Sequence, residues 1–359
     1  MKIYPNKLAK SHVPASHGGK YGTKNSNPDV IDFSSNVNPL GCHPGVKRYL
    51  KKQLDLISEY PDPDSTHIRK NLSWLTGISK DQIIVGNGAT EIIYNFCQTF
   101  LNKKMTVLIP IPTFSEYETS AKLSECKLTF FKTMNLTNDL KKFITKIPRN
   151  GCVFLCNPNN PTGALIQKKD MIKIISAAKK KSTIVFVDET FIELVPDHDE
   201  SVVKSIKKFE NLFILRSLTK SFGLAGLRIG YGLGSSQIIN PLQKIKIPWN
   251  VSNIAQGAAS AAICYHPFLD KTRKLIKKEK NFISSKLATS KNFTCFDSST
   301  NFILVKTKTK SKVLQKKLLK HKILIRDCST FHGLDQNYIR IAVKTRKENT
   351  KLLNALGVN

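Results

Sequence analysis

The chain is short of acidic residues, of long hydrophobic runs and of clustered cysteines. Its 26 Asp and Glu residues stand against 57 Lys and Arg residues, which gives a formal net charge of +31. No apolar run approaches the roughly 20 residues of a transmembrane helix, so we expect no membrane-spanning helix. The eight cysteines are scattered without a C-x-x-C pair, and we therefore expect neither a zinc site nor a disulfide framework.

The length and the beginning of the chain bear on its architecture and its compartment. With 359 residues, the chain is long enough for two domains with a substantial core. Its first residues, MKIYPNK, contain no apolar stretch of the kind that a secretory signal needs. We therefore expect reduced cysteines and a cytoplasmic location.

The excess of positive charge raises the question of a nucleic-acid or membrane partner. The excess is almost entirely lysine, since only nine of the basic residues are arginine. The longest lysine runs, such as Lys179–Lys181, are short, and aromatic residues do not interleave with them as a base-stacking surface requires. The pattern favours a solvated, lysine-rich surface that attracts anionic substrates, with no nucleic-acid and no membrane partner.

Apolar runs that end in polar residues alternate with helical segments over most of the chain. Strands are expected at residues 106–110, 128–131, 151–157, 184–188, 211–216 and 229–233. Helices are expected at residues 44–57, 64–76 and 169–180. Continuous apolar strands are typical of an α/β fold, in which helices cover both faces of a mostly parallel sheet. Polar residues at the carboxyl ends of such strands line the ligand crevice.

The character of the chain changes after Pro267. A lysine-rich helix is expected over residues 270–289, and the short strands and helix that follow are typical of a smaller α+β domain. We divide the chain into an N-terminal arm that joins the small domain and the active site (1–44), a large domain (45–266) and a small domain (267–359).

The strongest chemical signal is the motif SLTKSFGLAGLRIGY. It places Lys220 among small hydroxyl residues that include Ser217 and Thr219, and Arg228 follows in a glycine-rich apolar run. Burial lowers the pKa of a lysine and frees its amine for attack on a carbonyl, while hydroxyls and an arginine suit a phosphate. A lysine for an aldehyde beside a phosphate cradle is what pyridoxal phosphate requires. The alternative is an ordinary solvated lysine in a surface loop.

Three further segments offer partners for such a cofactor. In NPNNPTG, two Asn-Pro steps fix a rigid loop, from which Asn160 can donate its amide to a ring hydroxyl or to a substrate carboxylate. Asp188 ends an apolar strand, where a partly buried carboxylate would keep a pyridine nitrogen protonated; a helix-capping aspartate is the alternative. The glycine turn at residues 86–90 opens a helix whose N–H groups can approach an anion, although many βα turns look alike.

Together these motifs resemble the fold-type I pyridoxal-phosphate enzymes of the class I/II aminotransferase group. NPNNPTG, DETF, SLTKSFGLAGLRIGY and the C-terminal Arg340 match the signatures of that group, over nearly the whole chain. The resemblance implies a seven-stranded sheet in the large domain and pyridoxal 5'-phosphate as cofactor. It implies that Lys220 is catalytic and binds the cofactor covalently, that Asp188 pairs with the pyridine nitrogen and that Asn160 contacts the ring O3′. By the same resemblance, Phe114 stacks on the ring face and Arg340 holds the substrate α-carboxylate. The residues implied to hold the cofactor phosphate are Gly88, Ala89, Thr90, Ser217, Thr219 and Arg228.

Finer marks resemble one branch of the group, the threonine-phosphate decarboxylases of the cobalamin pathway. They are HGG near the N-terminus, DFSSNVNPLG, EYPD, IPWNV and ILIRDC. This resemblance implies that His17, Asn36, Tyr60 and Arg326 surround a substrate phosphate. Tyr60 would come partly from a second subunit, which implies a homodimer with shared active sites. Lys20 departs from the pattern, since that branch often has asparagine there.

Phe191 also agrees with this branch, which resembles this chain in having phenylalanine there. Most relatives, including most histidinol-phosphate aminotransferases, carry a tyrosine at this position, whose hydroxyl bonds the cofactor O3′. The resemblance implies decarboxylation of O-phospho-L-threonine to (R)-1-aminopropan-2-yl phosphate for cobalamin biosynthesis. A histidinol-phosphate aminotransferase stays open as an alternative, because the residues do not fix which Cα bond is broken. A phosphoserine decarboxylase also stays open, because the residues do not fix the substrate beyond a phosphorylated amino acid. A basic nucleic-acid-binding protein with an enzyme-like fold is the remote alternative.

Overall fold

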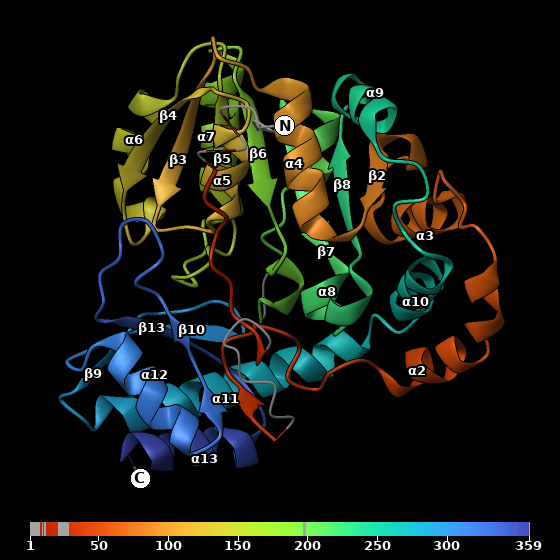
Figure 1. Ribbon diagram of the computed structural model, residues 1–359. Coiled ribbons are helices and arrows are strands. Elements are labelled where there is room, and N and C mark those ends of the chain that lie inside the picture. The colour runs from red at the N-terminus through yellow and green to blue at the C-terminus, as the bar shows by residue number, and fades with distance from the viewer. Residues whose placement is uncertain (1–7, 9, 11, 21–28, 197–198, 359) are drawn as a thin grey trace, which may run out of the picture.

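A seven-stranded sheet forms the centre of the computed structural model, and a smaller sheet lies below it in Figure 1. The structure describes residues 8, 10, 12–20, 29–196 and 199–358, so part of the expected arm lies outside the described ranges. Across the large sheet the strands are β2 (Ile83–Gly86), β8 (Gly230–Gly234), β7 (Leu212–Ser217), β6 (Ile184–Asp188), β5 (Cys152–Cys156), β3 (Thr106–Ile111) and β4 (Lys127–Lys132). Only β8 runs antiparallel to its neighbours among these described strands, so the prediction of a mostly parallel sheet is confirmed.

Helices cover both faces of the large sheet. One face packs against α4 (Gly88–Phe100), α5 (Glu116–Lys122) and α9 (Ser236–Ile245). The other packs against α2 (Pro44–Lys51), α3 (Thr66–Thr76), α6 (Leu140–Lys146), α7 (Lys168–Lys179) and α10 (Asn253–Cys264). In β5, for example, Val153 and Leu155 join one core and Phe154 joins the other, which explains the continuous apolar runs of the sequence. None of the helices in the described ranges is long and apolar enough to cross a bilayer.

The smaller part combines helices with an antiparallel sheet, as expected for an α+β domain. Its helices are α11 (Phe268–Ala288), α12 (Ser311–Lys320) and α13 (Arg346–Leu356). Its sheet has the order β12 (Arg326–Asp327), β13 (Tyr338–Ala342), β10 (Phe302–Thr307) and β9 (Phe293–Cys295). In addition, β1 (Ile31–Asp32) pairs in parallel with β11 (Ile323–Leu324), so this segment of the expected arm joins the smaller part. The boundaries after residues 44 and 266 stay predictions.

The helix expected over residues 44–57 is wrong in its second half. α2 ends at Lys51, and a separate 3₁₀ helix, η2 (Leu54–Ser58), follows. Leu54 and Ile57 have the spacing of a helix face, but they are 52% and 71% exposed. The core of this chain therefore offers no packing that would extend the α-helix through them.

Candidate active site

A cavity of about 350 Å³ lies between the large sheet and the smaller one. Its wall includes the carboxyl ends of β5, β6 and β7 and side chains of β12 and β13, as expected for a ligand crevice in an α/β protein. It brings together most residues selected from the sequence: His17, Asn36, Ala89, Thr90, Phe114, Asn160, Asp188, Ser217, Thr219, Lys220, Arg228, Arg326 and Arg340.

Two selected residues lie outside this wall. Gly88 stands directly behind it, since a Cβ built at Gly88 would lie 2.7 Å from Nη2 of Arg228. Its φ of +80° also favours glycine. Tyr60 is 83% exposed, and its ring centre lies 5.1 Å from that of Trp249. Within this single chain, Tyr60 therefore takes no part in the cavity.

Lys220 lies in the short helix α8 (Leu218–Ser221), directly after β7. Desolvation by burial lowers the pKa of Lys220 to about 8, and the guanidinium groups of Arg340 and Arg228 act in the same direction. The backbone N–H of Asn38 donates to the carbonyl oxygen of Lys220 over 2.9 Å and helps to fix α8. The amine thus loses its proton far more readily than that of an ordinary lysine, as attack on an aldehyde requires.

This lowered pKa predicts how the cofactor-free protein combines with pyridoxal phosphate. Only the neutral amine attacks the aldehyde, so the rate of covalent attachment should rise about tenfold per pH unit below the pKa and level off above it. With a pKa of about 8 for Lys220, the plateau should begin near pH 8. Stopped-flow absorbance of the cofactor measures this rate. A rate that keeps rising towards the ordinary lysine value of 10.5 would contradict the prediction.

Asp188 presents a buried carboxylate at the end of β6. Its Oδ1 accepts from the N–H of Thr190 (2.8 Å), and its Oδ2 accepts from the hydroxyl of Tyr117 (2.7 Å). Burial raises the pKa of Asp188, and these hydrogen bonds oppose the rise. A protonated ring nitrogen would supply the cation that a buried carboxylate needs. Tyr117 was not selected from the sequence, in which nothing connects it with Asp188.

Hydroxyls, a guanidinium group and backbone N–H groups meet in another part of the cavity. The side-chain oxygens of Ser217 and Thr219 lie 2.7 Å apart. Arg228 has a left-handed φ of 53°, and its Nη1 donates to the carbonyl of Ala225 (3.1 Å). The first turn of α4 lies close to this guanidinium at Gly88, where the positive φ favours glycine. Such a cradle suits a dianionic phosphate.

Arg326 of β12 and Arg340 of β13 are direct partners in the antiparallel ladder. Both side chains therefore point to one face of the smaller sheet, and both are buried in the cavity wall. Burial, with a further contribution from Arg326, lowers the pKa of Arg340 to about 10. Like charges opposite each other destabilise a sheet, so the pair calls for a functional reason. It suits a ligand that carries two anionic groups.

Buried polar atoms of the cavity wall retain unused hydrogen-bonding capacity. Arg340 donates from Nη1 to Oδ1 of Asn160 and from Nη2 to the carbonyl of Ser34 (2.7 Å). Nε of Arg340 and Oδ1 of Asn36, however, have no hydrogen-bond partner among the described residues. Because buried polar groups are normally paired, these atoms indicate where a ligand binds.

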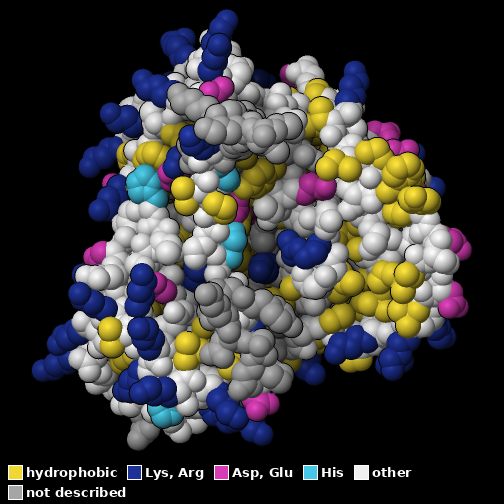
Figure 2. Space-filling view, viewed as in Figure 1, with side chains coloured by type: hydrophobic (Ala, Val, Ile, Leu, Met, Phe, Trp, Pro, Cys, Tyr) yellow, Lys and Arg dark blue, Asp and Glu magenta, His cyan; other side chains and the backbone are white. Residues whose placement is uncertain are grey.

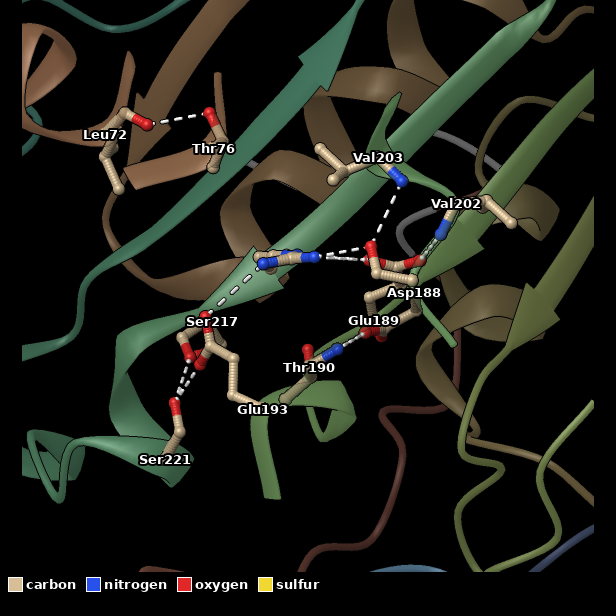
Figure 3. A network of polar contacts seen from close by, with 12 residues as sticks. Leu72, Thr76, Asp188, Glu189, Thr190, Glu193, Val202, Val203, Ser217 and Ser221 are labelled. Carbon is tan, nitrogen blue, oxygen red and sulfur yellow. Dashed lines mark hydrogen bonds and ion pairs between the residues drawn. The ribbon is translucent and has the colours of Figure 1, made fainter. Parts of the chain in front are cut away.

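A buried network behind the cavity fixes the ends of β6 and β7 (Figure 3). Arg216 donates from Nε and Nη2 to Oε2 of Glu189, over 3.1 and 2.9 Å. Its Nη1 lies 3.6 Å from Oε1 of Glu193, whose other oxygen accepts from the hydroxyl of Ser221. In the sequence, Glu189 directly follows Asp188 and Ser221 directly follows Lys220. The network therefore holds the two groups in place from outside the cavity.

The cavity residues fit pyridoxal phosphate in each of its parts. They provide an amine of lowered pKa for the aldehyde, a buried carboxylate for the ring nitrogen, and a cradle for the phosphate. Phe114 adds an aromatic face beside them. Nowhere in the described ranges do three or more His, Cys, Asp or Glu side chains come together in a way that could hold a metal ion.

Comparison with known proteins finds relatives named histidinol-phosphate aminotransferase and relatives named threonine-phosphate decarboxylase. The family model for aminotransferase class I and II matches residues 28–356. A histidinol-phosphate aminotransferase of Methanococcus aeolicus is 34% identical over 97% of this chain and 95% of its own. A threonine-phosphate decarboxylase of Salmonella typhimurium is 32% identical over 92% of this chain and 91% of its own. The crystal structure of a histidinol-phosphate aminotransferase from Clostridium acetobutylicum matches with a TM-score of 0.83 and 32% identity, covering 91% of this chain and 98% of that one.

Proposed function

The chain belongs to the aminotransferase class I and II family, and we propose that it decarboxylates O-phospho-L-threonine to (R)-1-aminopropan-2-yl phosphate in cobalamin biosynthesis. The pair of buried arginines, Arg326 and Arg340, carries this proposal. O-Phospho-L-threonine has a carboxylate on Cα and a phosphate on the adjacent Cβ, whereas histidinol phosphate has no carboxylate. The similarity to the Salmonella typhimurium decarboxylase is compatible with this proposal, although histidinol-phosphate aminotransferases are equally similar to the chain.

The cofactor is pyridoxal phosphate, which when bound withdraws electrons from the substrate Cα. We assign its ring nitrogen to Asp188, its ring face to Phe114, and its aldehyde to Lys220. Its phosphate we assign to the cradle of Gly88, Ala89, Thr90, Ser217, Thr219 and Arg228. Asn160, whose Oδ1 is already engaged by Arg340, keeps its amide N–H groups for the ring hydroxyl and the substrate.

The substrate is held in our proposal at both of its anionic groups. Arg340 binds the α-carboxylate, and Arg326, His17 and Asn36 bind the phosphate. The bond between Cα and the carboxylate then breaks, CO2 leaves, and the electron pair remains at Cα. Lys220 delivers a proton from Nζ to Cα, which completes the product.

Release of CO2 tests this function. The cofactor-loaded protein is incubated with O-phospho-L-threonine and no keto acid, and CO2 is measured over time. Continuing release, beyond one equivalent per site, is expected, since an aminotransferase without an acceptor stops after one half-reaction. Absence of CO2, together with conversion of the cofactor to its amine form by histidinol phosphate, would overturn the proposal. O-Phospho-L-serine in the same assay distinguishes the phosphoserine decarboxylase.

Histidinol-phosphate aminotransferase is the second candidate, because relatives of that name are as similar to the chain as the decarboxylases are. Phe191 argues against it. Its ring packs edge-on against Phe302 with 5.1 Å between ring centres, and it offers the cofactor no hydroxyl. Phe191 thus makes this part of the wall apolar.

We also propose that the protein is a cytoplasmic homodimer. Figure 2 shows hydrophobic side chains gathered on the right-hand side of the molecule, over α2, η2, α3, the end of α9 and the segment after it. The large exposed ones are Tyr49, Leu54, Ile57, Tyr60, Trp74, Ile245, Ile247 and Trp249. Contiguous apolar patches of this kind mark protein interfaces, and a second copy would account for the exposure of Tyr60. Light scattering should give twice the chain mass of 40.3 kDa.

The proposed cytoplasmic location agrees with the eight free cysteines, because cysteines stay reduced in that compartment.

A further inference from the structure

The described arm segment, residues 12–20, reaches the cavity and is tied to two other parts of the chain. The carbonyl oxygen of Ser16 accepts from Nη2 of Arg326 over 2.6 Å. The N–H of Gly19 donates to the hydroxyl of Ser34 over 2.7 Å. Between these two anchors lies His17, whose side chain is half exposed and lines the cavity.

His17 contacts a buried carboxylate, that of Glu116, on a helix that covers the large sheet. Glu116 begins α5, and its side chain is only 6% exposed. Oε1 of Glu116 lies 2.6 Å from Nε2 of His17, and Oε2 accepts from the hydroxyl of Tyr94 over 2.8 Å. The ring centre of His17 is also 5.9 Å from that of Phe114, at the cavity wall.

The carboxylate is charged when it binds the arm. Burial raises the pKa of Glu116, but the hydrogen bonds from His17 and Tyr94, together with electrostatic attraction to His17 and His12, outweigh this effect and leave the pKa below its ordinary value. Without the histidine, Oε1 would be a buried, ionised oxygen that has lost its close partner, which is costly. Glu116 is thus a buried binding partner for His17. Its carboxylate fixes one ring nitrogen of His17, while the ring lines the cavity.

We propose that Glu116 is a positioning residue, which holds His17 of the arm at the cavity and thereby makes the site selective for a phosphorylated substrate. The inference rests on the proposed function in one respect, namely that the ligand carries a phosphate. Glu116 itself touches neither substrate nor cofactor, so all of its effect on binding should pass through His17.

Replacement of Glu116 with glutamine tests this role. Titration of the bound cofactor's absorbance gives the affinities for O-phospho-L-threonine and for L-threonine. Glu116→Gln should weaken the phosphorylated ligand about tenfold, as for loss of one charge-assisted contact, and should change L-threonine less than about twofold. In turnover, KM should rise and kcat should change little. Glu118→Gln is the matched control on the same helix, since Glu118 contacts Lys122 and His332, away from the cavity wall, and it should leave both affinities unchanged.

A double-mutant cycle separates positioning from a general structural effect. The variant with both His17→Ala and Glu116→Gln should bind O-phospho-L-threonine as weakly as His17→Ala alone. Additive losses, or equal weakening of both ligands by Glu116→Gln, would overturn the proposal. If the unmodified protein releases no CO2, the decarboxylase function fails, but the ratio of the two affinities still decides the role of Glu116.

Discussion

Replacement of Lys220 with alanine should lower turnover by at least about a thousandfold, the order of magnitude that a positioned proton donor contributes. The variant loses the amine of lowered pKa that attaches to the cofactor and, in our proposal, the proton that Cα receives. Borohydride reduction of the loaded protein makes the bond between the cofactor and its lysine permanent. Mass spectrometry of the unmodified protein should then find the added cofactor on the peptide that contains Lys220, and the variant should lack it.

Lys122→Ala is the matched control for this experiment. Lys122 is 60% exposed and pairs with Glu118 at the surface, so its loss should alter neither labelling nor turnover. Normal turnover of Lys220→Ala would remove the central residue from the mechanism. Labelling of another lysine in the unmodified protein would place the cofactor outside this cavity, because Lys220 is the one lysine among the described residues of its wall.

The fold was readable from the sequence because burial on both sides leaves a continuous apolar signal. β5 and β6, for instance, are predicted within one residue of each end, and β6 ends in the polar cavity residue Asp188. Lys220, Asp188 and Asn160 were recognisable because their chemistry depends on short motifs.

Contacts between segments that lie far apart in the chain could not be predicted from the sequence. His17 and Glu116 are 99 residues apart, and Tyr117 and Asp188 are 71 apart, so no local pattern announces either hydrogen bond. The direct pairing of Arg326 with Arg340 is likewise a matter of strand register. Register depends on how the chain returns to the sheet, and only the structure shows that the two arginines share a face.

This pairing predicts different ligand selectivities for two alanine variants. Arg326→Ala should weaken O-phospho-L-threonine roughly ten- to a hundredfold, which corresponds to about 1.5–3 kcal/mol, and should leave L-threonine nearly unaffected. Arg340→Ala should weaken both ligands by similar factors, because both carry the α-carboxylate. The affinities follow from titration of the bound cofactor's absorbance.

The two variants control for each other, since each removes one of two buried arginines from the same face of the same small sheet. Relief of the repulsion between them should offset part of the lost hydrogen bonding, so thermal unfolding should change little in either variant. Equal losses of both ligands in Arg326→Ala would remove Arg326 from the phosphate site. Arg326→Lys keeps the charge without the planar fork, and it should recover only part of the affinity if the guanidinium binds two phosphate oxygens at once.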